Sequence, residues 1–197
     1  MKILMYITEK VLKEVEEKYG KPRIIELAFE MKEDEFRIMR ESMRNNRAHD
    51  ITFIIEKGDL IAVIRKSSHP PGVYRIPSGG VELGEDLETG LQREAFEETG
   101  LKIEILNYLL RVEACFTFNN LHQKWRSHVF RTKWVSGKLA PHDHEEIEEA
   151  RWVTLDELCG EIREKMLESD SGGLHYRVAL TDAAVEELLR SRSTAFS

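Results

Sequence analysis

Cysteine, long apolar runs and an excess of basic residues are all scarce in this chain, and each shortage excludes a class of protein. The two cysteines among 197 residues, Cys115 and Cys159, are too few for a disulfide framework and share no metal-like spacing. We therefore expect a protein of the reducing cytoplasm. No run approaches the roughly 20 apolar residues of a transmembrane helix, so no membrane partner is expected. The first residues become charged by Glu9, too early for a signal peptide.

A positive charge balance is also missing, since 29 basic residues face 36 acidic ones and give a net charge of −7. Such a balance disfavours broad, nonspecific binding to a nucleic-acid backbone, so nucleic acid is not the expected partner, although a local basic face stays open. It suits a protein that recruits divalent cations. The apolar fraction of 41% is enough for a real core, and the length suits one domain with an extension.

Residues 1–48 are predicted to form a small N-terminal α/β extension. The expected elements are a short strand at 2–7, a helix at 9–19, a strand whose apolar residues alternate from Ile25 to Met31, and a helix at 33–46. This unit is too small to be stable alone. We therefore expect it to pack on the rest of the chain or on a second copy in a homodimer.

Residues 49–168 are predicted to form the main domain, in which strands surround one acidic helix. The expected strands lie at 51–56, 60–65, 73–76, 102–117, 124–135 and 151–153, and the expected helices at 86–99 and 155–167. Residues 169–197 complete the chain with a linker at 169–173, a helix at 182–191 capped by Thr181, and a tail. This mixture of helices and strands indicates the α/β class.

Residues 79–101 carry the strongest functional signal. Glu94, Glu97 and Glu98 stand at i, i+3 and i+4, so a helix places the three carboxylates on one face. Carboxylates that close repel one another, and a partly buried cluster of them needs a cation or shared protons. Oxygen ligands without nearby histidine or cysteine favour Mg²⁺ or Mn²⁺ over zinc. The alternative is an ordinary solvated acidic helix.

Glycines and an arginine frame these carboxylates. Gly79 and Gly80 permit a close approach to the backbone before the helix, and Gly100 stands where a helix commonly stops. Arg93 precedes Glu97 by four residues and can orient that carboxylate. With these positions the segment resembles the Nudix box, G-x5-E-x7-R-E-U-x-E-E-x-G-U, in which U is aliphatic. The residues that fill it are Gly79, Glu85, Arg93, Glu94, Ala95, Glu97, Glu98, Gly100 and Leu101.

The resemblance extends upstream to residues 74–80, which are similar to the family's aromatic residue followed by L-P-G-G, with Ser78 in place of a glycine. It implies an α/β/α sandwich with a mixed β-sheet, to which the N-terminal extension is added. It also implies a hydrolase dependent on Mg²⁺, with Mn²⁺ as the alternative metal. Such an enzyme cleaves a diphosphate linkage in a small nucleotide-derived substrate.

The same resemblance assigns roles to individual residues. Glu94, Glu97 and Glu98 would bind the metal together with the carbonyl oxygen of Gly79. Arg93 would orient a neighbouring carboxylate through a charge-assisted hydrogen bond. The resemblance therefore places the catalytic centre on the helix expected at 86–99.

The general base is open, because the family draws it from different places. Glu94 is one candidate, and Glu146 and Glu145, in the polar loop at 137–149, are two others. The alternative for this loop is an ordinary solvated surface. His142 and His144 flank an aspartate there, but two histidines without a further clear ligand are more typical of a surface than of a metal site.

Substrate recognition must come from outside the box. Arg65 ends a predicted strand and Arg75 precedes the box, so both could reach a phosphate, although an ordinary strand-end charge is the alternative for Arg65. Phe116 and Trp125 could stack on a nucleobase, since an aromatic face accepts any base. Packing in the core is the alternative for these two aromatic residues.

Two signatures that mark particular substrates in the family are missing here. Where some ADP-ribose-cleaving members carry a proline, this chain has Cys115 and Phe116, and the tyrosine of some dinucleoside polyphosphate hydrolases is replaced near Phe118. ADP-ribose, nucleotide sugars, dinucleoside polyphosphates and nucleoside triphosphates therefore stay open. Two other functions stay open as well. One is a nucleotide-sensing regulatory module, and the other is an RNA 5′-end pyrophosphohydrolase, which the arginines of the extension would suit.

Overall fold

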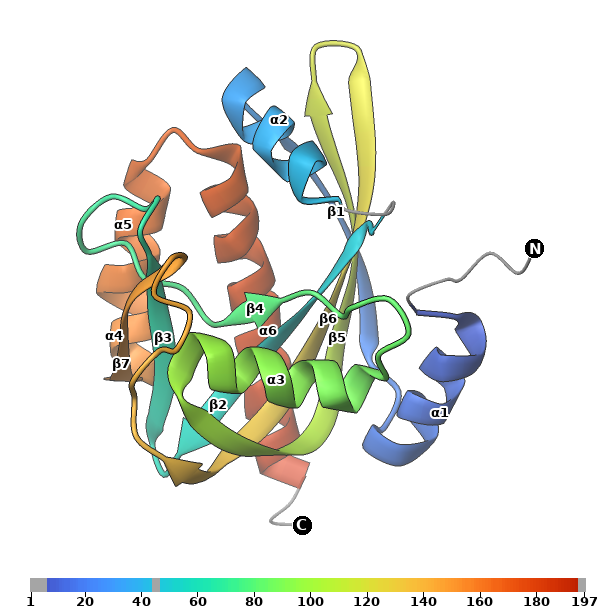
Figure 1. Ribbon diagram of the computed structural model, residues 1–197, viewed down its shortest axis with the longest axis vertical. Helices are drawn as coiled ribbons and strands as arrows, with labels where there is room; N and C mark the ends of the chain where they lie inside the picture. Colours follow the sequence, from blue (N-terminus) through green and yellow to red (C-terminus); the bar gives the residue numbers. More distant parts are fainter. Residues whose placement is uncertain (1–6, 44–46, 195–197) are drawn as a thin grey trace.

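The computed structural model describes residues 7–43 and 47–194 as a mixed seven-stranded sheet with helices on both faces (Figure 1). The expected strand at 2–7 and the last turn of the helix expected at 33–46 fall mostly outside these residues. No helix within this described part is long and apolar enough to span a membrane. The elements in chain order are α1 (Glu9–Tyr19), β1 (Arg23–Glu30), α2 (Glu33–Ser42), β2 (His49–Lys57), β3 (Leu60–Lys66), β4 (Ser78–Gly79), α3 (Leu87–Thr99), β5 (Leu101–Phe118), β6 (Leu121–Gly137), β7 (Ile147–Thr154), α4 (Leu155–Glu157), η2 (Leu158–Ile162), α5 (Arg163–Glu168) and α6 (Gly172–Thr194).

The strands lie in the order β1-β5-β6-β2-β3-β7, with β4 beside β2. β5 and β6 form the expected long antiparallel hairpin, which turns at Asn119 with a φ of 51°, a left-handed conformation that asparagine tolerates. β2 and β3 form the second expected hairpin. β2 also runs parallel to β6 and antiparallel to β4, so the segment that leads into α3 lies against the centre of the sheet.

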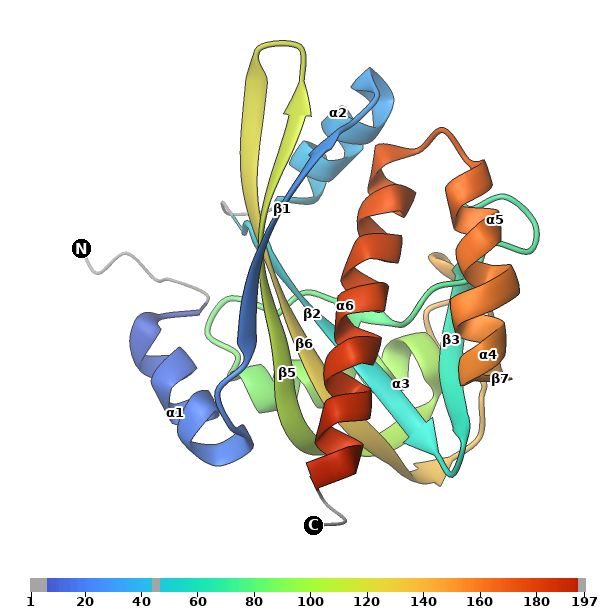
Figure 2. The same cartoon turned by 180° about the vertical axis from the view of Figure 1, so that it is seen from behind.

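Two apolar clusters, one on each face of the sheet, hold the helices. Because successive side chains of a strand point to opposite faces, Phe53 of β2 joins the cluster under α1 and α3, while Ile54 joins the cluster under α6. Leu91 of α3 and Leu188 of α6 are fully buried in these two clusters. Figure 2 shows α6 on the side of the sheet away from α3. These layers confirm the predicted α/β/α sandwich.

The N-terminal extension is built into the same sheet. β1 pairs in parallel with β5 from Arg23 to Glu30, and its side chains alternate between half-buried and exposed along most of the strand. α2 packs through Phe36, whose ring centroid lies 6.1 Å from that of Phe118 near the tip of the β5–β6 hairpin. The end of the extension precedes β2, so Arg47 lies where the chain enters the central strands of the sheet.

The strand expected at 73–76 is shifted in the structure. Arg75 makes only an isolated bridge with Ile64, and the paired strand is β4, at Ser78–Gly79. Pro77 has no N–H to donate, but its carbonyl oxygen accepts a hydrogen bond from Phe53 at 3.1 Å. Hydrogen bonding with β2 therefore begins at the Pro77 carbonyl and continues into Ser78 and Gly79, after the proline.

The C-terminal helix is longer than the sequence predicted. α6 begins at Gly172 rather than at residue 182, so Thr181 lies inside the helix, 4% exposed, and does not cap it. The residue that satisfies the first turn is Ser171, whose hydroxyl accepts a hydrogen bond from the Leu174 N–H at 3.0 Å. Gly172 and Gly173, which lie in the linker expected at 169–173, are the first residues of the helix.

Candidate active site

The caps of α3 fix where its glutamates point. The carboxylate of Asp86 accepts a hydrogen bond from the Thr89 N–H at 2.9 Å, which satisfies the first turn. At the other end Gly100, at a φ of 74°, donates its N–H to the Phe96 carbonyl at 2.7 Å. With Leu91 buried against the sheet, the helix has one fixed register relative to β4.

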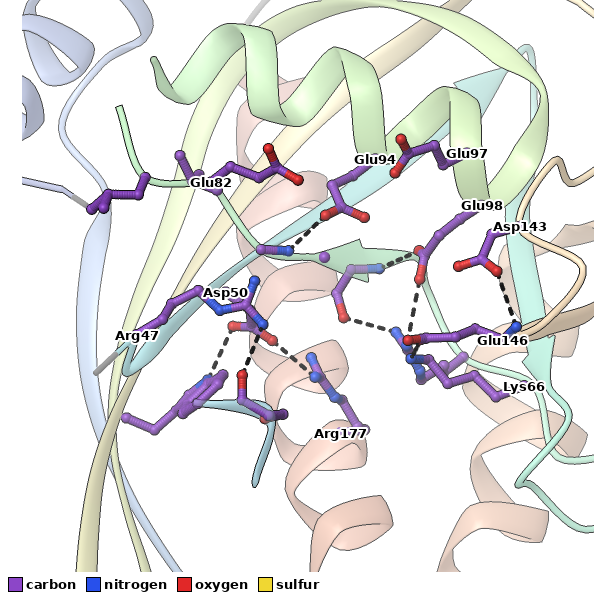
Figure 3. Close-up of a pocket in the computed structure, with 18 residues that line it drawn as sticks. Arg47, Asp50, Lys66, Glu82, Glu94, Glu97, Glu98, Asp143, Glu146 and Arg177 are labelled. Atoms are coloured by element: carbon purple, nitrogen blue, oxygen red, sulfur yellow. Dashed lines mark hydrogen bonds and ion pairs between the residues drawn. The ribbon is translucent and has the colours of Figure 1, made fainter. Parts of the chain in front are cut away.

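The glutamates of α3 form one wall of a cavity of about 770 Å³ (Figure 3). Figure 3 shows cations on the other side of this space, and they come from separate parts of the chain: Arg47 before β2, Lys66 at the end of β3, and Arg177 on α6. Arg75 also lines the cavity. An acidic wall that can hold cations thus faces a basic wall that can hold anions.

Glu94 lies against the backbone of Gly79, the last residue of β4, and of Gly80, which follows it. Its carboxylate accepts hydrogen bonds from the Gly80 N–H at 2.9 Å and from Arg93 Nη1 at 3.0 Å. A Cβ on Gly79 would lie 2.0 Å from the carboxyl carbon of Glu94, so only glycine permits this approach. Burial raises the pKa of Glu94, and the Arg93 charge partly opposes that shift.

Glu98 is the most buried carboxylate of the site, with 4% of its surface exposed. It accepts a hydrogen bond from the Ser78 N–H at 2.9 Å and lies 3.8 Å from the Arg75 guanidinium. Burial raises its pKa to about 7. Arg75 in turn donates to the Ser78 hydroxyl at 2.8 Å. The serine that departs from the family's lead-in thus holds a buried arginine beside Glu98.

Arg93 ties three carboxylates together. It donates two hydrogen bonds to Glu85, at 2.8 and 2.9 Å, and one each to Glu94 and Glu97 at 3.0 Å. It also donates to the Gly80 carbonyl at 2.8 Å. These contacts, those to Glu85 first, raise the pKa of the guanidinium. The arginine therefore holds the acidic wall in place as a permanent cation.

The polar loop between β6 and β7 closes the C-terminal end of α3. The backbone N–H groups of His142 and Asp143 donate to the Glu97 carbonyl at 2.8 and 3.0 Å. The His142 ring stacks on Phe96, with centroids 4.4 Å apart, so this histidine serves packing. Asp143 lines the cavity together with Glu146.

Glu146 lines the cavity and forms an ion pair with Lys66. Its carboxylate accepts a hydrogen bond from Lys66 Nζ at 2.5 Å, and 61% of the side chain stays exposed. The hydrogen bond from Lys66 and then its charge lower the pKa of Glu146, which is therefore ionised at neutral pH. The loop thus supplies a solvent-accessible carboxylate that can accept a proton.

A buried ion pair forms the floor of the cavity. Asp50 accepts hydrogen bonds from Arg177 Nη2 at 2.8 Å, from Trp125 Nε1 at 3.2 Å and from the Ser127 hydroxyl. Burial alone would raise the pKa of Asp50, but the Arg177 charge and these hydrogen bonds hold it below its ordinary value. The Ser127 hydroxyl also bonds to Tyr176 at 2.6 Å, so α6 is anchored under the site.

The donor set of the acidic wall fits a hard divalent cation. No group of three or more His, Cys, Asp or Glu side chains in residues 7–43 and 47–194 is already arranged to hold a metal ion, since Glu94 and Glu98 are turned toward backbone N–H groups. Yet the Glu94 carboxylate lies against the backbone of Gly79, in a space that a Cβ on this residue would fill. Such all-oxygen donors are what Mg²⁺ or Mn²⁺ takes.

Of the four residues predicted to recognise substrate, the structure places two at the cavity and two away from it. Arg75 and Trp125 line the cavity. Arg65 points elsewhere and pairs with Glu148 at 2.5 Å. Phe116 is 3% exposed and packs in the core, its ring perpendicular to that of Tyr176, which favours the packing alternative for this residue.

Asp50 and Arg177 are cavity residues that sequence reasoning missed, whereas Arg47 was considered only as one of the arginines of the extension. Arg177 left a signal, because it is the one ionised side chain in the otherwise apolar or aromatic stretch from Tyr176 to Leu180. A charge in such a stretch requires a partner once it is buried. Asp50 left no signal, since its role depends on how β2 enters the sheet.

Comparison with known protein families finds that residues 44–175, about two thirds of the chain, match the NUDIX domain. This range begins at the end of the extension and includes the first turn of α6. It contains both walls of the cavity except Arg177 and Ser42.

Curated relatives match over a shorter span. A protein of Pseudomonas aeruginosa named NAD-capped RNA hydrolase NudC is 32% identical over 105 residues, which are 53% of this chain and 35% of the relative. A namesake from Edwardsiella ictaluri is 32% identical over 108 residues, 55% of this chain and 39% of the relative. The chain thus matches little more than a third of the length of these relatives.

Solved structures with a similar arrangement include a NUDIX hydrolase from Nitrosomonas europaea, with a TM-score of 0.48 and 19% identity over 74% of this chain and 90% of that one. A UDP-X diphosphatase matches with a TM-score of 0.43 and 18% identity over 61% of this chain and 60% of that one.

Proposed function

The chain belongs to the Nudix hydrolase family, and on that premise we propose that it cleaves a diphosphate linkage in a nucleoside diphosphate derivative, using Mg²⁺ or Mn²⁺. The observation that carries the proposal is the cavity of about 770 Å³ with glutamates on one side and cations on the other. A diphosphate is negatively charged and gains charge as a P–O bond breaks, so it needs positive charge from both sides. The names of the curated relatives make a dinucleotide diphosphate such as NAD the first substrate to test.

The metal would be held by Glu94, Glu97 and Glu98, with the Gly79 carbonyl beside them. When bound, a divalent cation polarises phosphoryl oxygens and lowers the pKa of a water molecule. The chain's own part is preorganisation: Arg93 keeps two of these carboxylates in place, and the absence of a side chain at Gly79 lets the Glu94 carboxylate lie against the backbone there.

Glu146 is the general base in this proposal. It faces the cavity, is ionised at neutral pH and is oriented by Lys66, so an Oε atom can accept the proton of the attacking water. We expect Glu146→Gln to lower kcat roughly a hundredfold with KM nearly unchanged, because loss of a general base costs about 10²- to 10⁴-fold. The measurement is steady-state kinetics on the best substrate.

Glu145→Gln is the matched control for that measurement, because it removes the neighbouring carboxylate of the same loop, which does not line the cavity. Its kcat should equal that of the wild type. Full turnover by Glu146→Gln would remove this residue from the mechanism and leave Glu94 as the candidate base.

Substrate and metal are tested together by a panel. The protein is incubated with NAD, ADP-ribose, a nucleotide sugar, a dinucleoside polyphosphate and a nucleoside triphosphate, and products are identified by mass. We expect cleavage of a diphosphate-linked member, abolished by EDTA and restored by excess Mg²⁺ or Mn²⁺. Unchanged turnover in EDTA would contradict the metal. Tight nucleotide binding without turnover of any member would favour a sensor module.

A second candidate substrate is a nucleotide-capped RNA 5′ end, favoured by the name of the curated relatives. The net charge of −7 argues against extended contact with an RNA backbone. A short NAD-capped RNA added to the same panel decides between the two. Faster turnover of the capped RNA than of free NAD would make RNA the substrate.

A further inference from the structure

We infer that Arg47, which lies near the end of the N-terminal extension just before β2, binds a phosphate of the substrate and selects ligands with two adjacent phosphates. The inference rests on the proposed function, because it names a determinant of specificity within the same cavity. It concerns a residue outside the box, and it gives the extension a part in recognition as well as in packing.

The Arg47 guanidinium is pressed against Gly80. A Cβ at Gly80 would lie 1.3 Å from Arg47 Nη1 and 2.2 Å from its Cζ, so the arginine occupies the space that any other residue would fill. On its other side Gly80 donates its N–H to Glu94 at 2.9 Å. Arg47 and the acidic wall therefore meet across a single glycine. Figure 3 shows the Arg47 side chain reaching into the cavity across from Glu94.

Arg47 differs from the other cations of the cavity in having no carboxylate partner among residues 7–43 and 47–194. Its one hydrogen bond there is a long one, 3.4 Å from Nη2 to the Ser42 carbonyl, and its buried Nε has no partner in that part of the chain. The other three cations are each paired: Arg177 with Asp50 at 2.8 Å, Lys66 with Glu146 at 2.5 Å, and Arg75 with Glu98 at 3.8 Å.

An unpaired guanidinium in a cavity is suited to an anion of the ligand. Its planar fork binds two oxygens of one phosphate, and such charge-assisted hydrogen bonds are roughly twice as strong as neutral ones. A metal ion on Glu94 would hold one phosphate, and Arg47, on the far side of Gly80, would hold the next. This arrangement selects a diphosphate over a monophosphate.

Binding of a diphosphate that cannot be hydrolysed tests the inference without requiring turnover. Isothermal titration with α,β-methylene-ADP in Mg²⁺ compares the full-length wild type with Arg47→Ala and Arg47→Lys. We expect Arg47→Ala to raise Kd about ten- to a hundredfold, since hydrogen bonds to a charged group are being lost. Arg47→Lys should recover part of the affinity, because it keeps the charge but not the fork. Arg40→Ala, on the exposed face of α2, is the matched control and should bind like the wild type.

Gly80→Ala provides an independent variant that leaves the arginine in the chain. Its methyl group would displace the guanidinium, which is the mobile end of a long side chain, so the fold should be kept. We expect a similar rise in Kd in the wild-type background and almost none in the Arg47→Ala background, because the two changes remove the same contact. Additive effects would contradict the geometry.

The outcomes separate this inference from the proposed function. Equal Kd values for Arg47→Ala and the wild type, or no binding by the wild type, would overturn the inference, even if the enzyme turns over a member of the panel. An Arg47-dependent Kd without turnover of any panel member would support the inference and overturn the hydrolase activity. Thermal unfolding of each variant shows that a changed Kd is not a loss of fold.

Discussion

Glu97→Gln is expected to lower kcat/KM roughly a thousandfold while the protein stays folded. Glu97 is the most exposed of the three glutamates of the acidic wall, and its carboxylate accepts a hydrogen bond from Arg93 at 3.0 Å. An amide of the same size keeps the shape of the helix but removes the negative charge that, in the proposed mechanism, would hold a metal. Loss of metal-based stabilisation of the transition state costs several kcal/mol, and each 1.4 kcal/mol is about tenfold in rate.

The matched control for this prediction is Glu88→Gln. Glu88 stands on the same helix, but its carboxylate pairs with Lys18 at 2.7 Å, outside the cavity. The same substitution there should leave kcat/KM unchanged. Raising the Mg²⁺ concentration should recover part of the activity of Glu97→Gln, because its metal affinity is weakened. Wild-type turnover by Glu97→Gln would exclude this residue as a metal ligand.

The acidic wall was predictable from the sequence because everything that shapes it is local. The spacing of Glu94, Glu97 and Glu98 fixes a common face once a helix forms, and the caps at Asp86 and Gly100 fix its ends. The predicted helix and the observed α3 differ by one residue. Side chains that lie on one element need no knowledge of the rest of the fold.

The basic wall was predictable only in part: Arg75 was expected to reach a phosphate, but Arg47 and Arg177 join it only through the fold. Arg47 comes from the extension and Arg177 from α6, and β2 lies between them in the chain. Neither residue belongs to a local pattern with a known partner. Only the pairing of β1 with β5 and the packing of α6 under β2 bring the two arginines to one cavity.

The beginning of α6 was missed for a different physical reason. From Gly172 to Leu180 its residues alternate between buried and half-buried, which is the period of a strand, because the helix is covered on more than one side. A helix enclosed in this way has no clean apolar stripe for a sequence to display. The pattern becomes helical only after Thr181, which is where the sequence placed the start.

Asp50→Asn is expected to lower the free energy of unfolding by about 3 kcal/mol, the largest stability effect among our predictions. Asp50 is 5% exposed and is the carboxylate partner of Arg177, which is tied to the core through α6. The asparagine would leave a buried guanidinium uncompensated. Its NH₂ group would face a donor in either orientation of the amide, Arg177 on one side or the Trp125 indole and Ser127 hydroxyl on the other. Urea unfolding gives the measurement.

Asp182→Asn is the control for that experiment. Asp182 also pairs with an arginine, Arg163 at 3.0 Å, but 39% of its side chain is exposed, so the same substitution should cost less than about 1 kcal/mol. The double variant Asp50→Asn/Arg177→Met should lose less stability than the sum of the two single variants, since no unpaired charge remains. Additive losses would mean that the two residues stabilise the fold separately.

Acid unfolding gives a second, independent readout of the same ion pair. The folded-state pKa of Asp50 lies below its ordinary value of 3.8, so the carboxylate contributes its full stabilisation above that pH. The contribution is lost as the pH falls through the folded-state pKa, because the protonated acid no longer balances Arg177. Asp50→Asn has no proton to take up at this position, so its stability should fall less steeply than that of the wild type below pH 4. Parallel acid profiles would show that Asp50 is not held ionised by Arg177.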